Sequence, residues 1–459
     1  MEITTQIIGF IASLSFLIFT HELGHYFFAR LFKTRVNKFY LFFNPGFSIL
    51  RAKNCGGKWQ FSYFSKESPE AWNEYPDNTE WGIGWLPLGG YCAINGMVDE
   101  TTKADELPEE PQPYEFRSKK TWQRFFIISG GVLVNFISAL ILYPILLFVW
   151  GKEYVPNENL TYGMEFNRTA KQAGFCDGDI PISADGKTLE TINDCFNIIL
   201  FDNPKQVVVK RNGEETTLNM PSDFTKQLLT NGYQFLYFNF PFVVDSVLPN
   251  TSAAQIGMLQ GDSIVAIDNK TFISQSEMSE QLAVLANQKT TIDFYRAGQL
   301  FQDTITPDSL GKLGIARKDP SNFIKTNKEN YTLAEAIPAG FHAGINTLKS
   351  YIKQFKLFAY KEGAKQMGGF ISIGKIFPKS WDWQRFWETT ALLAIILAFM
   401  NILPIPALDG GYLLFILVEM IIRRKPSDKL ITYANAVGMT LLLLLILYAN
   451  GMDIIRLFS

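Results

Sequence analysis

Histidine and cysteine are both scarce in this sequence, which has three histidines and four cysteines among 459 residues. The cysteines are Cys55, Cys92, Cys176 and Cys195, and none belongs to a C-x-x-C pair. Neither a zinc knuckle nor a disulfide framework is therefore indicated. Cys176 and Cys195 could pair if their region faces an oxidising compartment, but we expect two partly buried thiols instead.

Net charge is also low, because 42 basic residues nearly balance 44 acidic ones and leave −2. A basic footprint for nucleic acid is absent, and we expect no nucleic-acid partner. By contrast, 47% of the residues are hydrophobic. That share is too high for an average soluble protein and too low for a pure bundle of membrane helices. The composition predicts a few membrane helices combined with substantial soluble domains.

Four apolar stretches are long enough to cross a membrane, and they predict an α-helical transmembrane core of four spans in contact with a lipid bilayer. They cover residues 3–31, 125–150, 390–422 and 430–448. The first lacks a basic leader and a small-residue cleavage site, so we expect a retained helix rather than a removed signal peptide. The third is too long for one straight span, and Pro404, Pro406 and the turn at residues 409–411 should break it.

Basic residues predict the orientation of these spans. They follow the first span, precede the second, and link the third to the fourth (Lys33, Arg35, Lys38, Lys119, Lys120, Arg124, Arg423, Arg424, Lys425 and Lys429). Such loops are cytoplasmic by the positive-inside rule, which places both termini and the region from 151 to about 385 outside the cytoplasm.

The predicted segments follow in chain order. They are a first span (1–32), a cytoplasmic-side loop with a membrane-associated β region (33–120), a second span (121–150), two soluble modules (151–235 and 236–320), amphipathic membrane-surface helices (321–385), a third span (386–423), and a fourth span with its tail (424–459).

Within the β region, residues 85–97 read W-L-P-L-G-G-Y-C-A-I-N-G-M. Turn residues and alternating apolar positions predict a β-hairpin there, which we expect to associate with the membrane. Such backbone is tolerated at membrane depth only where protein or a water-filled cavity satisfies its polar groups.

The two soluble modules form an internal repeat. The stretch from Ala170, A-K-Q-A-G-F-C-D-G-D-I, matches the stretch from Ala253, A-A-Q-I-G-M-L-Q-G-D-S-I, at its alanine, glycine and Gly-Asp positions. The pattern resembles PDZ domains of the bacterial protease type, which implies two extracytoplasmic PDZ-like α+β modules that bind peptide ends by strand addition. Two generic β domains acting as a steric gate remain an alternative.

The strongest candidates for metal binding and catalysis lie in the first span, at His21-Glu22-Leu23-Gly24-His25. Residues four apart share a helix face, so His21 and His25 can bind one metal ion with Glu22 beside it. Imidazole suits zinc, and ionisable groups inside a span are costly unless they serve a function. The alternative interpretation is that these residues form a polar helix face packed in a bundle, and we give it about a tenth of the probability.

A catalytic zinc site needs a third protein ligand, and two residues are candidates. His342 is the remaining histidine, but it belongs to the amphipathic region predicted on the opposite side of the membrane. Asp409 lies within the broken third span, where proline and glycine can turn a carboxylate toward a neighbouring helix. We expect Asp409 to be the ligand, although an aspartate there could also cap the helix that follows.

Together, H-E-L-G-H in the first span and N-I-L-P-I-P-A-L-D-G-G in the third resemble the paired signatures of the site-2 proteases, a family of intramembrane zinc metalloproteases. With W-L-P-L-G-G-Y, the R-F-F-I-I-S-G-G-V-L-V-N-F start of the second span and the tandem modules, the chain is most similar to the bacterial type that regulates sigma-E. The resemblance implies a Zn²⁺ cofactor held by His21, His25 and Asp409, with Glu22 as catalytic base.

The resemblance also implies substrate contacts. Asn401 and Pro404 would help to hold the unwound substrate, and Gly89, Gly90 and Tyr91 would present an edge to it. Implied substrates are single-pass membrane proteins such as anti-sigma factors in a stress response, and remnant signal peptides, cut in the bacterial inner membrane. The modules would act as a size filter.

Two other functions compete with proteolysis. A non-catalytic PDZ-bearing membrane receptor or scaffold would keep the modules and lose part of the H-E-x-x-H set, which is intact here. A metal transporter would need more intramembrane acids or histidines than the spans offer.

Overall fold

A computed structural model describes residues 2–97, 110–364 and 367–458 of the chain. They fold into two compact units. The helical unit comprises Met1–Gly151, Asn330–Ile352 and Lys365–Ser459. The β-rich unit comprises Lys152–Glu329 and Lys353–Ala364.

Among the described residues, four helices are long and apolar enough to cross a membrane. They are α1 (Glu2–Leu31), α2 (Thr121–Trp150), α11 (Trp383–Ile402) and α13 (Asp428–Phe458). The expected third span is divided, because α11 ends at Ile402 and a short helix, α12 (Asp409–Ile422), follows after a turn. Pro404 and Pro406 lie in that turn, and Ala407 adopts a left-handed φ of 76°. The predicted break is therefore present, and because of it α12 does not have to continue along the axis of α11.

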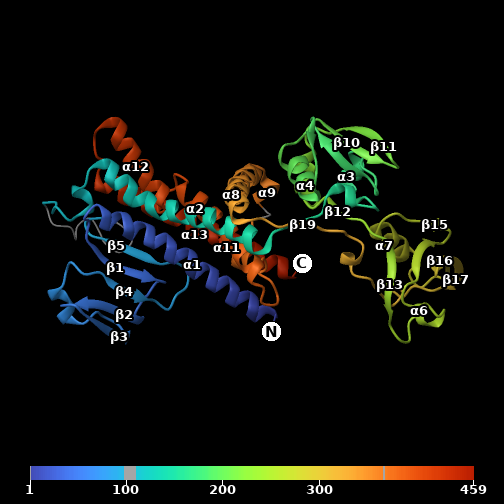
Figure 1. Cartoon of the computed structure of the whole chain (residues 1–459), viewed down its shortest axis with the longest axis horizontal. Coiled ribbons are helices and arrows are strands. Elements are labelled where there is room, and N and C mark those ends of the chain that lie inside the picture. The colour runs from blue at the N-terminus through green and yellow to red at the C-terminus, as the bar shows by residue number, and fades with distance from the viewer. Residues whose placement is uncertain (1, 98–109, 365–366, 459) are drawn as a thin grey trace. The chain divides into compact units, whose positions relative to one another are not determined.

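Helix α2 is the centre of the helical unit, since α1, α11 and α12 all pack against it (Figure 1). Its first turn also holds the far end of α12 through an ion pair. Arg124 Nη2 lies 2.5 Å from Glu419 Oε1, and both side chains are largely buried. The two helices are thus joined by a charged contact as well as by apolar packing.

The longest helix in the amphipathic region predicted over residues 321–385 is α8 (Leu333–Phe355). Its Gly340 and Gly344 lie against Pro144 and Tyr143 near the end of α2. Three short helices follow it, η6 (Lys356–Ala359), α9 (Lys361–Ala364) and α10 (Phe370–Gly374). Asp453 of α13 accepts hydrogen bonds from the backbone amides of Gly369 (3.0 Å) and Ser372 (2.9 Å), which anchors α10.

Residues 36–94 form a five-stranded sheet with the order β3-β2-β4-β1-β5. The strands are β1 (Val36–Leu41), β2 (Ser48–Cys55), β3 (Lys58–Ser65), β4 (Glu80–Ile83) and β5 (Tyr91–Ile94), and a short helix η1 (Glu70–Glu74) precedes β4. The hairpin predicted over Trp85–Met97 is wrong. One strand of that stretch forms, and it pairs with β1 rather than with a neighbouring turn partner. Residues 98–109 of the predicted cytoplasmic segment lie outside the described residues.

The first repeat of the β-rich unit contains six strands and three helices. They are β7 (Met164–Phe166), α3 (Arg168–Gln172), β8 (Ile180–Ala184), β9 (Lys187–Thr188), α4 (Ile192–Phe201), β10 (Gln206–Arg211), β11 (Glu214–Asn219), α5 (Phe224–Asn231) and β12 (Leu236–Phe238). Because β12 pairs with β7, this repeat runs a few residues beyond the expected boundary at residue 235.

The second repeat has the same succession, except that no counterpart of α5 precedes its last strand. It contains β13 (Phe242–Val247), α6 (Ser252–Gln255), β14 (Ser263–Ile267), β15 (Lys270–Thr271), α7 (Gln275–Val284), β16 (Thr290–Arg296), β17 (Gln299–Ile305) and β18 (Ile315–Arg317). The segments by which the chain enters and leaves the β-rich unit form two strands, β6 (Lys152–Tyr154) and β19 (Asn327–Glu329). These two strands pair with each other in an antiparallel ribbon.

A matching ion pair fixes the glycine turn of each repeat. Asp179 accepts from Arg211 Nε at 2.8 Å, and Asp262 accepts from Arg296 Nε at 2.8 Å. Each arginine also donates to a turn carbonyl, Gly174 O or Gly257 O. The two halves of the internal repeat identified from the sequence therefore also share the same Asp–Arg contact.

Substituting Asp262 with asparagine should weaken the second repeat by about 2 kcal/mol, because charge-assisted hydrogen bonds are lost. Burial alone would raise the pKa of Asp262, but hydrogen bonds from Arg296 and the Leu259 amide outweigh it and hold the pKa below its ordinary value. A lowered pKa gives stability that is present at neutral pH and lost as the pH falls below about 4.

Hydrogen exchange in peptides from residues 242–305 of the full chain measures this effect. Asp268→Asn is the matched control, because Asp268 is exposed and its φ of 51° suits asparagine. Equal protection of the Asp262 variant and the wild type at pH 7 would contradict the prediction.

Candidate metal centre

Helix α1 brings the two histidines of the H-E-x-x-H motif onto one face. The Nε2 atoms of His21 and His25 lie 3.3 Å apart, and the His25 ring is almost fully buried. Glu22 lies next to them, 9% exposed, and lines the same cavity. The arrangement agrees with the spacing argument made from the sequence.

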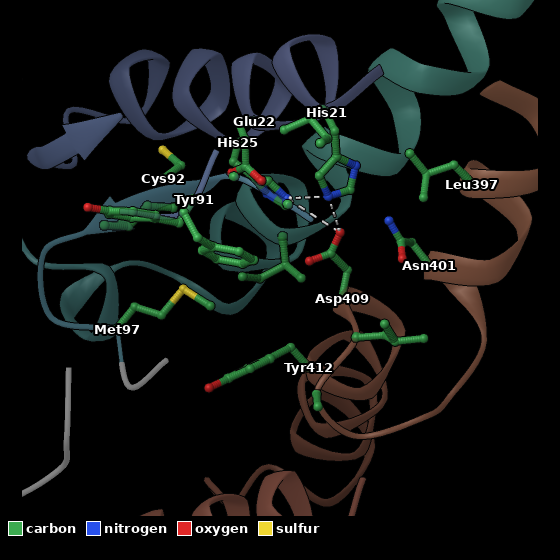
Figure 2. Close-up of a pocket in the computed structure, with 18 of the residues that line it drawn as sticks. His21, Glu22, His25, Tyr91, Cys92, Met97, Leu397, Asn401, Asp409 and Tyr412 are labelled. Atoms are coloured by element: carbon green, nitrogen blue, oxygen red, sulfur yellow. Dashed lines mark hydrogen bonds and ion pairs between the residues drawn. The ribbon is translucent and has the colours of Figure 1, made fainter. Parts of the chain in front are cut away.

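Asp409 meets this pair from α12. Its Oδ2 atom is 3.2 Å from His21 Nε2 and 3.4 Å from His25 Nε2, as the dashed lines in Figure 2 show. Asp409 is the first residue of α12, and the structure gives that helix no side-chain cap. The capping alternative considered from the sequence is therefore not what orients Asp409.

Glycine makes the return of the chain into α12 possible. A Cβ atom at Gly410 would lie 2.0 Å from the carbonyl oxygen of Leu403, inside any tolerated contact. The turn at residues 403–408 can fold tightly over the start of α12 only because this position lacks a side chain. The Asp-Gly-Gly sequence thus sets the position of the carboxylate.

Three ligand atoms of His21, His25 and Asp409 lie within 4.8 Å of one another. No second group of this kind occurs within residues 2–97, 110–364 and 367–458. His342, the other histidine considered, is exposed on α8. The structure therefore brings together the three residues expected to bind metal and leaves out the one that was rejected.

The donor atoms fit a zinc ion. Tetrahedral ligands about 2.0–2.1 Å from zinc lie about 3.3 Å from one another, and the three observed separations are 3.2, 3.3 and 3.4 Å. Asp409 Oδ2 is buried and receives no hydrogen bond from the described residues. An oxygen of this kind needs a positive partner.

The His25 ring is oriented for the same purpose. Its Nδ1 atom lies 2.9 Å from the carbonyl oxygen of Ile127 on α2. A carbonyl can only accept, so Nδ1 carries a hydrogen and Nε2 is the nitrogen left to bind a metal ion beside Asp409. With the ring neutral, the Nε2 lone pair and the carboxylate oxygen face each other, an arrangement that a bound cation stabilises.

A cavity of about 540 Å³ opens beside the three residues. Helices α1, α11, α12 and α13 and the segment around β5 line it. Of the expected substrate contacts, Asn401, Gly89, Gly90 and Tyr91 line the cavity. Pro404 is exposed in the turn before α12 and is not part of the lining.

The segment before β5 runs close beside α1. A Cβ atom at Gly90 would lie 2.6 Å from Tyr40 O and 2.7 Å from Ile18 Cγ2, so only glycine fits. The Tyr91 ring stacks on Tyr40 with centroids 5.0 Å apart and an interplanar angle of 2°. Burial raises the pKa of Tyr91 to about 12, so its hydroxyl stays neutral and donates to Asn44 Oδ1 at 3.1 Å.

Sequence reasoning missed three groups on α2 and α13. Gly131 lies against both imidazoles, since its Cβ would be 2.5 Å from His25 Nε2 and 2.6 Å from His21 Cε1. Asn135 contacts His21 Nδ1. Asn435 donates to the hydroxyl of Tyr412 at 3.1 Å across the cavity. Asn135 and Asn435 are polar residues within apolar stretches, which was the available signal.

The sequence of this chain is similar to a known protein family and to several bacterial proteins. The sequence matches Peptidase family M50 over residues 9–65 and 68–445. It is 26% identical to a protein of Neisseria meningitidis, with 98% of this chain and 99% of the relative covered. A Ralstonia nicotianae protein is 25% identical with 98% of both chains covered, and a Rickettsia conorii protein is 26% identical with 99% of both covered. All three bear the name "Putative zinc metalloprotease".

Proposed function

The chain belongs to peptidase family M50, a family of zinc-dependent metalloproteases, and on that premise we propose that it cleaves transmembrane segments of membrane-anchored proteins. The observation that carries the proposal is the meeting of His21, His25 and Asp409 among helices apolar enough to lie in a membrane. Ionisable groups on membrane-spanning helices are costly and mark functional sites, which supports action on a substrate within the membrane.

The three residues would hold zinc, which supplies a Lewis acid and a water of lowered pKa when bound. Glu22 is the base in this proposal. It accepts a proton from the attacking water and then delivers that proton to the leaving amine of the scissile bond. Asn401 extends from α11 toward His21 and Asp409 (Figure 2), where its amide can donate to and accept from unwound substrate backbone.

Strand β5 supports binding of an extended substrate. It stands at the end of the described sheet with β1 as its neighbour, and its residues Tyr91, Cys92 and Ile94 line the cavity. An edge strand offers backbone groups that a substrate strand can pair with. A substrate helix that unwinds beside β5 would keep its backbone hydrogen bonds satisfied within the membrane.

Exposed aromatic side chains support an association of the sheet with the bilayer. Trp59, Phe61 and Tyr63 alternate along β3 and are 53%, 56% and 66% exposed. Tryptophan and tyrosine favour the interface between lipid and water. In the proposed orientation the sheet lies on the cytoplasmic side of a bacterial inner membrane, and both termini and the β-rich unit lie on the other side.

The substrates proposed are single-pass proteins of the anti-sigma factor type and remnant signal peptides. The two repeats would act as PDZ-like modules that bind peptide ends and exclude untrimmed proteins. Their matched Asp–Arg turns support a common architecture for both modules.

Reconstitution in lipid vesicles tests the proposal. The purified chain is mixed with a single-span protein that has either a large or a trimmed extracytoplasmic part, and fragment masses locate the cut. We expect zinc-dependent cleavage inside the span, faster for the trimmed form, and none with Glu22→Gln. Cuts confined to residues outside the span would refute intramembrane cleavage, and zinc binding without any cleavage would favour a scaffold.

A further inference from the structure

We infer that Asn135 is a positioning residue for the metal centre: its amide holds His21 in the tautomer whose Nε2 faces the metal. The inference rests on the proposed zinc site and adds a residue from outside the H-E-x-x-H and Asp-Gly motifs. Asn135 lies on α2, fully buried, with its amide between Thr20 and His21 of α1.

The contacts form a short chain of polar groups. Asn135 Nδ2 is 3.4 Å from His21 Nδ1, and Asn135 Oδ1 is 2.9 Å from Thr20 Oγ1. The nitrogen and the oxygen of an amide have nearly the same shape, so a half-turn of this group exchanges the two contacts. Thr20 Oγ1 in turn lies 3.0 Å from the carbonyl oxygen of Phe16. These groups are enclosed between α1 and α2, so each hydrogen must find its partner within the chain itself.

Counting hydrogens fixes the direction of this chain. A neutral imidazole that binds metal through Nε2 carries its hydrogen on Nδ1 and must donate it. With the amide rotated by a half-turn, the Asn135 oxygen is the acceptor within reach of that hydrogen. In that orientation the amide nitrogen faces Thr20 Oγ1 and can donate to it, and the single hydroxyl hydrogen of Thr20 goes to Phe16 O. The ring hydrogen of His21, one amide hydrogen of Asn135 and the hydroxyl hydrogen of Thr20 then each have an acceptor.

The reverse direction is incompatible with metal binding. If the amide nitrogen donated to His21 Nδ1, the ring hydrogen would be on Nε2, pointing at Asp409 3.2 Å away. That hydrogen would occupy the position where the ion binds. Metal binding through His21 Nε2 therefore requires the Asn135 amide to present its oxygen to His21, the reverse of the orientation in which Nδ2 faces Nδ1. Thr20 is compatible with this reversal, because its own hydrogen can go to Phe16 O and its oxygen can then accept from the amide nitrogen.

The same helix orients both ligands. Ile127 O receives the Nδ1 hydrogen of His25, and in the proposed amide orientation Asn135 Oδ1 receives that of His21. A main-chain carbonyl is present whatever the side chain is, but the acceptor for His21 depends on the identity of one residue. Substitution at position 135 is thus the direct test of how α2 supports the site.

The test measures zinc affinity of the full chain in detergent by competition with a chelator, together with the visible absorption of the cobalt-substituted protein. Asn135→Leu keeps the number and branching of the side-chain heavy atoms and removes the acceptor, and we expect a 10- to 100-fold loss of zinc affinity. Asn135→Asp keeps an acceptor, and we expect affinity within about threefold of wild type or tighter, with an unchanged cobalt spectrum. Packing alone would give the opposite order, because leucine suits an apolar surrounding better than a carboxylate.

Two further variants keep the test decisive. Thr20→Val removes the hydroxyl that contacts the Asn135 amide and leaves all three ligands in place. We expect it to lose less zinc affinity than Asn135→Leu does. This variant also tests the inference if the Asn135→Asp protein does not fold. Ser138→Ala is the matched control, since Ser138 bonds to its own helix at Val134 O (2.8 Å) one turn further on. Wild-type zinc affinity in Asn135→Leu overturns the inference if His21→Ala loses zinc. If His21→Ala also keeps zinc, the metal site itself is refuted, whereas failure to cleave membrane segments leaves these affinities unaffected.

Discussion

Replacing Glu22 with glutamine should lower the rate of peptide hydrolysis by about 10²- to 10⁴-fold, the usual contribution of a positioned general base. Glutamine has nearly the same shape, and its amide cannot accept a proton from water at neutral pH. Glu22 lines the cavity beside His21 and His25 but is not one of the three clustered ligands. The variant should therefore keep its zinc while it loses turnover.

Zinc content and initial rate, measured on the same vesicle preparation, separate these two effects. Glu388→Gln is the matched control, because Glu388 lies in α11 with partial exposure and takes part in a surface pair with Arg385. Surface pairs of this kind contribute little, so its rate should equal that of wild type. A Glu22→Gln protein that retains wild-type activity would remove this residue from the mechanism.

Gly131→Ala should have an equally severe effect although it removes no polar group. The new Cβ atom would lie 2.5 Å from His25 Nε2 and 2.6 Å from His21 Cε1. Both imidazoles would have to move by several tenths of an ångström or α2 would have to retreat. Displacements of about 1 Å near a reacting centre cost about 10²-fold in rate, and we expect zinc affinity to fall about 10- to 100-fold as for other disturbed ligand supports.

The matched control for this substitution is Gly451→Ala in α13, where nothing lies within 4 Å of the added atom. Alanine in a helix interior is more stable than glycine by about 0.5–1 kcal/mol, so that variant should be at least as stable and fully active. Isothermal titration with zinc and rate measurements on both variants give the comparison. Normal zinc binding by Gly131→Ala would show that α2 does not closely support the imidazoles.

The metal cluster was predictable from sequence because its signals are local. A four-residue spacing places His21 and His25 on one helix face whatever the tertiary structure. Asp409 was identified since an acid in an apolar stretch needs a partner and since glycine and proline break the helix there. The structure shows those three residues in contact.

Asn135 and Gly131 could not be identified in the same way. Their importance comes from the packing of α2 on α1, which no spacing along α2 reveals. Asn135 in isolation is one amide within an apolar helix, and Gly131 is one of many small residues. The register between two helices decides which of their side chains meet a ligand.

The hairpin prediction failed for a related reason. Alternating apolar residues identified Tyr91–Ile94 as strand-like, but the partner of this strand is β1, more than fifty residues earlier at Val36. Pairing between distant strands depends on the whole sheet, and β2, β3 and β4 lie between the two in sequence. A local pattern predicts that a strand exists and says little about its neighbour.

The contact between Arg124 and Glu419 bears on how the protein acquires its metal. Helix α12 is tied to α2 at the end opposite Asp409, so its docking does not depend on the ion. In domains that fold only around zinc, chelation unfolds the chain. Here the apoprotein should keep α12 in place, with the Asp409 carboxylate still directed at both histidines. Zinc would then bind to a preformed site without a folding reaction, and its binding should be reversible under native conditions.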